Sequence, residues 1–273
     1  MPEGDTVWLH AKRLHEALAG QELTHTDFRV PQLATTSLVG QTVLEVVPRG
    51  KHLLTRLSGG ATLHTHLRMD GTWGIYATGA TWTGGPDWQI RLVLGNATQT
   101  AVGYRMPVVE LIATAEEDRV VGHLGPDVCS PDFDREEALR RLAAEPEVEV
   151  GVALLDQRKV AGLGNMYRME ALFLEGVTPW SKVGDVQLGP LLDRSVLLIR
   201  ANLGSFSQPT TGSRRPSEEH WVFERGGRAC FRCGARIRKA DQGTPPQQRV
   251  TWWCPGCQLG PGPTWVPPRR GRR

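Results

Sequence analysis

The sequence has no run of 18 or more apolar residues and therefore predicts no transmembrane helix. It also lacks the basic start and apolar segment of a secretory signal peptide, because Glu3 and Asp5 stand where such a peptide would be basic. No internal repeat is visible. The chain has 273 residues, 40% hydrophobic and 22% charged, which is enough for two domains with separate cores. We expect a cytoplasmic protein with no membrane partner.

Cysteine is scarce, and four of the five cysteines form two pairs, Cys230/Cys233 and Cys254/Cys257, with 20 residues between the pairs. This C-x2-C-x20-C-x2-C spacing is typical of a tetrahedral four-thiolate zinc site, which leaves no open position for catalysis. We therefore expect one structural zinc ion, with a redox dithiol as the alternative. Disulfides are not expected in a cytoplasmic chain, and no chemistry is expected of Cys129.

Charge is unevenly distributed along the chain. Residues 1–224 hold 21 Lys and Arg against 28 Asp and Glu, whereas residues 225–249 hold 7 against 1 and residues 250–273 add four Arg. A basic C-terminal quarter favours contact with a polyanion such as nucleic acid, with a solvated basic face as the alternative.

Hydrophobic periodicity predicts a helix at the start, with Asp5 or Thr6 as its N-cap and Gly20 at its end. Residues 22–113 instead show short apolar segments separated by turn residues, which is typical of a β-sandwich or barrel. The strands expected most clearly are 53–57, 61–67, 89–94 and 108–112.

Beyond Pro131 the pattern becomes helical. Helices are expected after Asp132 or Asp134, at 148–155, after Gly164 and at 187–202. The polar segment 205–219 is expected to be a mobile loop, a hairpin is expected between the two cysteine pairs, and the tail from 259 is expected to be disordered.

The chain opens with Met1-Pro2-Glu3-Gly4-Asp5. Removal of Met1 would leave Pro2 with a secondary amine, which can attack the C1′ carbon of a nucleoside and form a positively charged iminium. The amine must be unprotonated to attack, and the helix that follows would lower its pKa. Glu3 can then act as a general acid and base.

Four motifs occur in a fixed order, namely Pro2-Glu3-Gly4, Arg49-Gly50-Lys51-His52, the segment 160–167 (Val-Ala-Gly-Leu-Gly-Asn-Met-Tyr) and the four-cysteine ribbon. Together they resemble the formamidopyrimidine-DNA glycosylase/endonuclease VIII family from residue 2 to about 258. Pro-Glu-Gly at the start is similar to the endonuclease VIII branch. The resemblance implies base-excision repair of damaged double-stranded DNA by a monomer that needs no small-molecule cofactor.

Roles follow from the resemblance for two groups of residues. It implies a Schiff-base nucleophile at Pro2, a general acid at Glu3, and phosphate contacts that assist elimination at Lys51 and Arg249. It also implies that Asn165, preceded by Gly164, grips phosphates in a helix–two-turn–helix motif. Taken singly, Lys51 reads as a surface lysine, Gly-Leu-Gly-Asn as a helix cap or a chance dinucleotide loop, and Arg249 as a hairpin charge.

A glycosylase must extrude its target nucleotide and fill the gap in the base stack. The segment 66–71 (His-Leu-Arg-Met-Asp-Gly) resembles the family's wedge loop, which would put Met69 at the intercalating position with Arg68 beside it. A second wedge region would fall near Arg105, where the sequence departs from the family pattern. Thr6 stands where many relatives have a second glutamate. His64 and His66 share one strand face and are interpreted as core histidines, with a metal pair as the alternative.

The sequence thus predicts an α+β protein of two domains. We expect an N-terminal β-sandwich with a leading helix at 1–125, a helix–two-turn–helix domain at 126–222, a zinc-finger hairpin at 223–258 and a disordered basic tail at 259–273. The expected function is a glycosylase and abasic-site lyase that excises oxidised bases, pyrimidines being favoured, by β/δ-elimination. The alternatives are a catalytically silent binder of damaged DNA with the same fold and an unrelated zinc-ribbon nucleic-acid protein.

Overall fold

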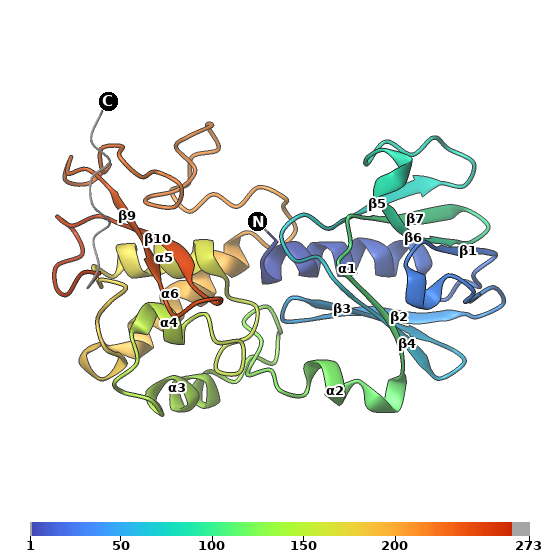
Figure 1. Cartoon of the computed structure of the whole chain (residues 1–273), viewed down its shortest axis with the longest axis horizontal. Helices are drawn as coiled ribbons and strands as arrows, with labels where there is room; N and C mark the ends of the chain where they lie inside the picture. Colours follow the sequence, from blue (N-terminus) through green and yellow to red (C-terminus); the bar gives the residue numbers. More distant parts are fainter. Residues whose placement is uncertain (1, 264–273) are drawn as a thin grey trace.

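The computed structural model describes residues 2–263 and divides them into a β-rich half and a helical half (Figure 1). Helix α1 (Gly4–Leu18) lies along the β-rich half, with its N-terminus at the junction between the halves. The expected disorder of the tail falls mostly on residues 264–273, which lie outside the described residues. Within the described residues, no helix is both long and apolar enough to cross a membrane.

Two four-stranded antiparallel sheets form the β-rich half and confirm the expected sandwich. One has the order β1-β6-β7-β5 and the other β2-β3-β4-β8. The strands are β1 (His25–Phe28), β2 (Val43–Arg49), β3 (His52–Leu57), β4 (Ala61–His66), β5 (Thr72–Ala77), β6 (Ile90–Gly95), β7 (Gln99–Tyr104) and β8 (Val108–Ala113). Short 3-10 turns lie at Pro31–Leu33, Asp87–Gln89 and Thr114–Glu116, followed by α2 (Asp118–Val121).

The helical half contains four further helices and a two-stranded hairpin. Its helices are α3 (Arg135–Ala143), α4 (Val150–Ala153), α5 (Asn165–Leu174) and α6 (Leu188–Ala201), with a 3-10 turn at Val183–Asp185. The hairpin consists of β9 (Arg238–Gln242) and β10 (Arg249–Trp253), paired antiparallel as expected between the cysteine pairs. Segment 205–219 forms neither helix nor strand.

Each half has its own apolar core. The apolar stripe of α1, Val7, Ala11, Leu14 and Leu18, is almost fully buried against residues of both sheets. The second core joins α5 and α6 to side chains of the hairpin and includes Tyr167 and Phe173. Packing in these two cores fixes the positions of α1 and α5, whose N-termini meet at the junction.

Two sequence-based boundaries were wrong. Helix α1 begins at Gly4 with Glu3 as N-cap, rather than after Asp5 or Thr6, because the Asp5 side chain is held by partners outside the helix. The helix expected at 148–155 is only the four-residue α4. By contrast, Asp134 caps α3, its carboxylate accepting a 2.9 Å hydrogen bond from the Glu137 amide as an N-cap aspartate should.

Candidate active site and DNA interface

Glu3 lies where the N-termini of two helices converge. It is the N-cap residue of α1, and its carboxylate accepts hydrogen bonds of 2.7 Å from the backbone amides of Gly164 and Met166, at the start of α5. A Cβ on residue 164 would lie 2.4 Å from the Glu3 carboxyl carbon, so only glycine permits this approach. The positive end of the α5 dipole thus faces a carboxylate that belongs to the N-cap residue of α1.

The pKa of Glu3 is raised to about 6, mainly because its carboxylate is fully buried, with the nearby charge of Lys51 acting in the opposite direction. A carboxyl group with this pKa exists in both protonation states near neutral pH. Glu3 can therefore give up or take a proton beside Pro2.

Lys51 reaches the same segment from the β2–β3 turn. Gly50 has φ 58°, in the left-handed region that glycine adopts without strain, and this turn aims the next side chain at the helical half. Lys51 Nζ donates a 2.8 Å hydrogen bond to the carbonyl of Leu163. Burial lowers the pKa of Lys51, while the charge of Glu3 opposes the shift. Glu3, which is adjacent to Pro2, and Lys51 thus meet around residues 163–166, although the three segments are far apart in the sequence.

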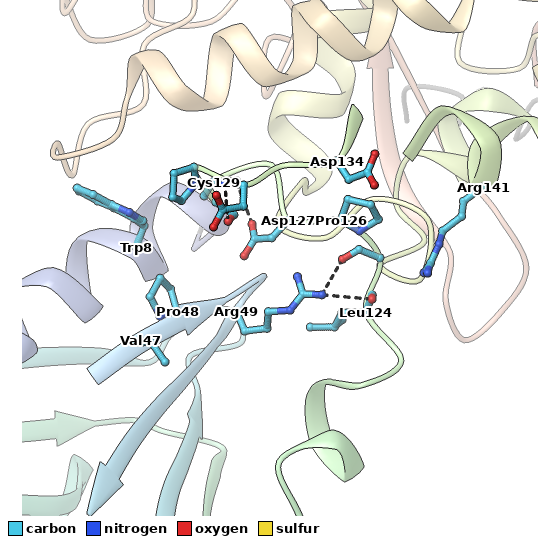
Figure 2. A pocket seen from close by; sticks show the side chains of 14 residues that line it. Trp8, Val47, Pro48, Arg49, Leu124, Pro126, Asp127, Cys129, Asp134 and Arg141 are labelled. Atoms are coloured by element: carbon cyan, nitrogen blue, oxygen red, sulfur yellow. Dashed lines mark hydrogen bonds between the residues drawn. The ribbon is translucent and has the colours of Figure 1, made fainter. Parts of the chain in front are cut away.

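Asp127, which the sequence analysis did not single out, fixes the turn that carries Lys51. Its carboxylate accepts from the Gly50 amide at 2.6 Å and from the Cys129 amide at 3.0 Å. Arg49 joins the same contact by donating to the carbonyls of Leu124 and Gly125 (Figure 2). These bonds hold the segment between the two halves against the sandwich. The bonds therefore fix the turn that carries Lys51 relative to the helical half.

Asp5 is a second buried carboxylate near Pro2, and the sequence analysis did not identify its partners. It accepts from the Tyr167 hydroxyl at 2.6 Å and from the Gln208 amide nitrogen at 2.9 and 3.0 Å. Gln208 also lies 3.3 Å from the Thr6 hydroxyl. No local signal marks these contacts, because Gln208 lies 203 residues from Asp5 in sequence.

Asn165, the first residue of α5, contacts the hairpin. Its side-chain nitrogen donates to the carbonyl of Val250 at 3.0 Å, and its side-chain oxygen accepts from the buried Arg168 at 2.6 Å. The adjacent Arg249 is exposed at the start of β10, with Nη1 donating to the carbonyl of Gln248 at 2.9 Å. Its charge is close enough to contribute to lowering the pKa of Lys51. The structure thus brings Asn165, Arg249 and Lys51 to one region.

The proposed wedge residues lie in two neighbouring turns of the sandwich. Met69 is 58% exposed, a high value for a large apolar side chain. Arg68 and Arg105 both adopt positive φ, 51° and 50°, which is uncommon and strained for a non-glycine residue. Arg105 Nε donates to the carbonyl of Asp70 at 3.0 Å, so the turn after β7 supports the turn after β4.

Several histidines lie next to the turn after β4, which carries Arg68 and Met69. His64 is within hydrogen-bonding distance of both His52, at 2.8 Å, and Glu110, at 3.1 Å. His66 accepts from the Arg68 amide at 2.9 Å, which ties the loop to the cluster. Burial lowers the pKa of His52 to about 3 and that of His66 to about 4, with neighbouring positive groups adding to the shifts. These rings are therefore neutral at pH 7, and His64 has hydrogen-bonding partners that the strand pattern alone did not show.

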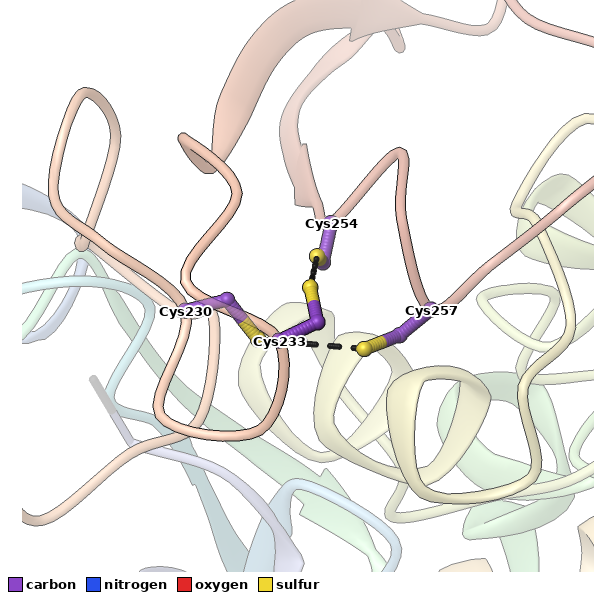
Figure 3. A group of neighbouring side chains, drawn as sticks. All are labelled: Cys230, Cys233, Cys254 and Cys257. Carbon is purple, nitrogen blue, oxygen red and sulfur yellow. Dashed lines mark hydrogen bonds between the residues drawn. The ribbon is translucent and has the colours of Figure 1, made fainter.

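The four paired cysteines converge as expected (Figure 3). Their sulfur atoms all lie within 4.8 Å of one another, and the Cys230–Cys257 and Cys233–Cys254 separations are 3.8 and 3.4 Å. Four thiolates around one tetrahedral ion with bonds of about 2.3 Å would be spaced about 3.8 Å apart. The cluster therefore fits a structural metal ion, and it is the one such group found among residues 2–263.

Comparisons with known proteins define the class to which this fold and site belong. The formamidopyrimidine-DNA glycosylase N-terminal domain matches residues 1–105, and the formamidopyrimidine-DNA glycosylase H2TH domain matches residues 124–189. A crystal structure of Lactococcus lactis formamidopyrimidine-DNA glycosylase, bound non-covalently to DNA containing an abasic site, superimposes with a TM-score of 0.77 at 25% identity, covering 95% of this chain and 100% of the other. The class is that of DNA-repair glycosylases with this two-domain fold.

Curated relatives refine this assignment. The chain is 54% identical to probable endonuclease 8 2 of Streptomyces coelicolor, covering 99% of this chain and 100% of the relative. It is 40% identical to DNA-(apurinic or apyrimidinic site) lyase Nei2 of Mycolicibacterium smegmatis, covering 94% and 99%, and 33% identical to endonuclease 8 of Escherichia coli O157:H7, covering 94% and 100%. The chain belongs to the formamidopyrimidine-DNA glycosylase/endonuclease VIII family of DNA glycosylases and abasic-site lyases.

Proposed function

We propose that this enzyme excises oxidised bases, preferentially pyrimidines, from double-stranded DNA and then cleaves the strand, with the amine of Pro2 as nucleophile after removal of Met1. The observation that carries the proposal is the convergence of Glu3 and Lys51 on residues 163–166, immediately beside Pro2. A buried acid and a partly buried amine next to a secondary amine are the groups that Schiff-base chemistry needs.

The reaction can be written with these residues. The Pro2 nitrogen forms a bond to C1′ while the C1′–base bond breaks, and Glu3 supplies the proton that the departing base requires. The Pro2 nitrogen then loses its proton, and the C1′–O4′ bond breaks as O4′ takes up a proton, which opens the sugar ring and gives an iminium. The iminium acidifies the C2′ hydrogens. Removal of one of these protons expels the 3′ phosphate, and a second elimination expels the 5′ phosphate. Water then hydrolyses the iminium and restores the amine.

The remaining residues hold the DNA in this proposal. Lys51 and Arg249 contact phosphates close to the lesion, and the basic hairpin adds the electrostatic attraction that dominates nucleic-acid affinity. Because the Asn165 side chain is engaged with Val250 and Arg168, we assign it the placement of the hairpin next to α5 as well as a part in phosphate binding. Met69 fills the gap left by the extruded nucleotide, supported by Arg68 and Arg105.

We assign the chemistry to residues 1–125, the DNA grip to residues 126–222 and 223–258, and one zinc ion to the four cysteines. Four thiolates favour zinc, and the closed coordination sphere gives the ion a structural role. The preference for pyrimidines is supported by the Pro2-Glu3-Gly4 start and by relatives named endonuclease 8.

Borohydride trapping tests the nucleophile. Wild-type protein incubated with a duplex bearing thymine glycol or an abasic site should form a covalent complex on reduction, and Pro2→Gly should greatly reduce it. Mass spectrometry of the purified chain should show that Met1 is absent, since a retained Met1 would leave the Pro2 nitrogen in an amide. Trapping that is equal in wild type and Pro2→Gly, or absent from both, would favour another nucleophile or a silent DNA-binding protein.

A lesion panel in the same assay tests substrate preference. Thymine glycol and 5-hydroxycytosine should be excised faster than formamidopyrimidine and 8-oxoguanine. The opposite order would contradict the pyrimidine assignment while leaving the nucleophile intact.

A further inference from the structure

The first part of segment 205–219 lies along α1, the helix that begins beside Pro2. The Phe206 ring packs on His10, with 5.2 Å between ring centroids, and the Arg13 guanidinium carbon lies 5.5 Å from the Phe206 centroid. One turn nearer the N-terminus, Gln208 bonds to Asp5 and Thr6. Residues 6, 10 and 13 share one face of a helix. Residues 206–208 therefore cover a continuous strip of α1.

Hydrogen bonds also hold the backbone at this point. The carbonyl of Gln208 accepts from the His220 ring at 3.1 Å, and the carbonyl of Pro209 accepts from the side-chain nitrogen of Asn202 at 3.1 Å. Asn202 further donates to the Tyr167 hydroxyl, which itself donates to Asp5. Gln208 therefore lies in a closed ring of bonds that joins α1, α5 and the end of α6.

The rest of the segment closes on itself and is fixed at its far end. The Thr210 amide donates to the Glu219 carbonyl at 2.8 Å, so residues 211–218 form a closed loop. Glu170, fully buried in α5, accepts from the amides of residues 221, 222 and 223 at 2.7–2.9 Å. The far end is thus fixed to α5, and the near end, through Gln208, makes the contact with the helix of the nucleophile.

We propose that Gln208 is a positioning residue, a latch that fixes the 211–218 loop relative to Pro2 so that the loop meets the base to be excised. The inference rests on the proposed function. Asp5 is three residues from Pro2, so a base attached to a sugar at the Pro2 nitrogen must lie near the place where Gln208 holds the loop. If Gln208 leaves, the buried Asp5 carboxylate loses two donor contacts while keeping that from Tyr167. The loop shifts, whereas α1 stays in place.

Two substrates separate this role from a general effect on the active site. Base excision from a thymine glycol duplex requires the loop to meet a base, whereas strand cleavage at a preformed abasic site does not. Single-turnover rates for Gln208→Ala should show base excision reduced about tenfold or more and abasic-site cleavage changed less than about threefold. Glu16→Ala, an exposed α1 variant whose native side chain pairs with Lys12, should leave both rates unchanged.

Gln208→Glu gives a readout that a purely structural role would not produce. It places a carboxylate against Asp5, so base excision should be slower than in Gln208→Ala at neutral pH. It should recover as the pH is lowered and the two carboxyl groups share a proton. Thermal unfolding checks that both variants fold. If either variant does not fold, Gln208→Asn replaces it in the same assays.

Equal losses on both substrates, or no loss on either, would overturn the latch. Failure of the proposed function would give a different result, because the wild-type protein would then process neither substrate. That result would also rule out the role given to Gln208. Selective loss of base excision, with pH-dependent recovery in Gln208→Glu, supports it.

Discussion

Glu3 has two roles that normally conflict, since its carboxylate binds backbone amides at the start of α5 and is also placed to exchange protons. A carboxylate that accepts two backbone amides is usually held ionised. Here complete burial outweighs those bonds and raises the pKa to about 6. The helix termini orient the carboxyl group, and desolvation keeps its proton available.

The pH dependence of base excision should reflect this balance. Activity that needs protonated Glu3 should fall as the pH rises through about 6 in the free enzyme, since the raised pKa marks the loss of the proton. Glu3→Gln should lower base excision about 100-fold or more and remove this limb from its residual pH–rate profile. Cleavage at a preformed abasic site, where no base departs, should be affected less. A limb near pH 6 that persists in the variant would assign that pKa to another group.

At the scale of single elements, the hairpin β9–β10 depends on two supports. The cysteine cluster closes one end, and Asn165 and Arg168 of α5 hold its middle through Val250 and Thr251. Because so small a module has little apolar core of its own, metal binding should supply much of its folding free energy.

Metal removal should therefore act on the hairpin first. Titration with a zinc chelator should abolish binding to an abasic-site duplex, measured by fluorescence anisotropy, before near-ultraviolet circular dichroism reports loss of the sandwich. Arg249→Ala with metal bound should weaken binding and reduce the slope of log affinity against log salt by about 1. The matched control is Arg119→Ala, which removes an exposed charge paired with Glu116 beside the β2–β8 sheet. Tight DNA binding by the metal-free protein would contradict the role given to Arg249.

Elements with a local signal could be predicted from the sequence, and contacts between distant segments could not. The α1 stripe, the Asp134 cap and the cysteine spacing are each readable within a few residues, and the structure has α1, α3 and the cluster close to the expected places. The start of α1 was misplaced because Asp5, a good N-cap residue, is held by Tyr167 and Gln208 instead. The same kind of long-range pairing concealed Asp127, whose partner Gly50 lies 77 residues away.

For the whole molecule, the proposed active site exists only while the two halves stay together. Pro2, Glu3 and Lys51 belong to the β-rich half, whereas residues 163–166 belong to the helical half. Arg49 and Asp127 join the halves on the other side of the same turn (Figure 2). A loss of folding stability that separates the two halves should therefore reduce enzyme activity.

Histidines set the pH dependence of that stability. Burial lowers the pKa of His10 to about 4, of His52 to about 3 and of His66 to about 4. The unfolded chain binds these protons at pH below about 6.5, whereas the folded chain does not until pH about 4. Stability should therefore be fully present above pH 6.5 and be lost as the pH falls toward 4. Glu3, whose pKa is raised to about 6, opposes this by binding one proton between about pH 4.5 and 6. Asp5, whose pKa is also raised by burial, acts in the same direction.

Urea unfolding between pH 7.5 and 5.0 measures the difference. Three histidines outnumber the two buried carboxyl groups that oppose them, so the free energy of unfolding should decrease with falling pH, by about 1–3 kcal/mol per pH unit near pH 5. His52→Asn should flatten this slope by about one proton, and His25→Asn, which changes a largely exposed ring in β1, should leave it unchanged. A flat profile in the wild type would mean that these rings remain accessible to protonation in the folded protein. In that case His66 could not hold the Arg68 amide at acidic pH, and the wedge loop would loosen before the fold does.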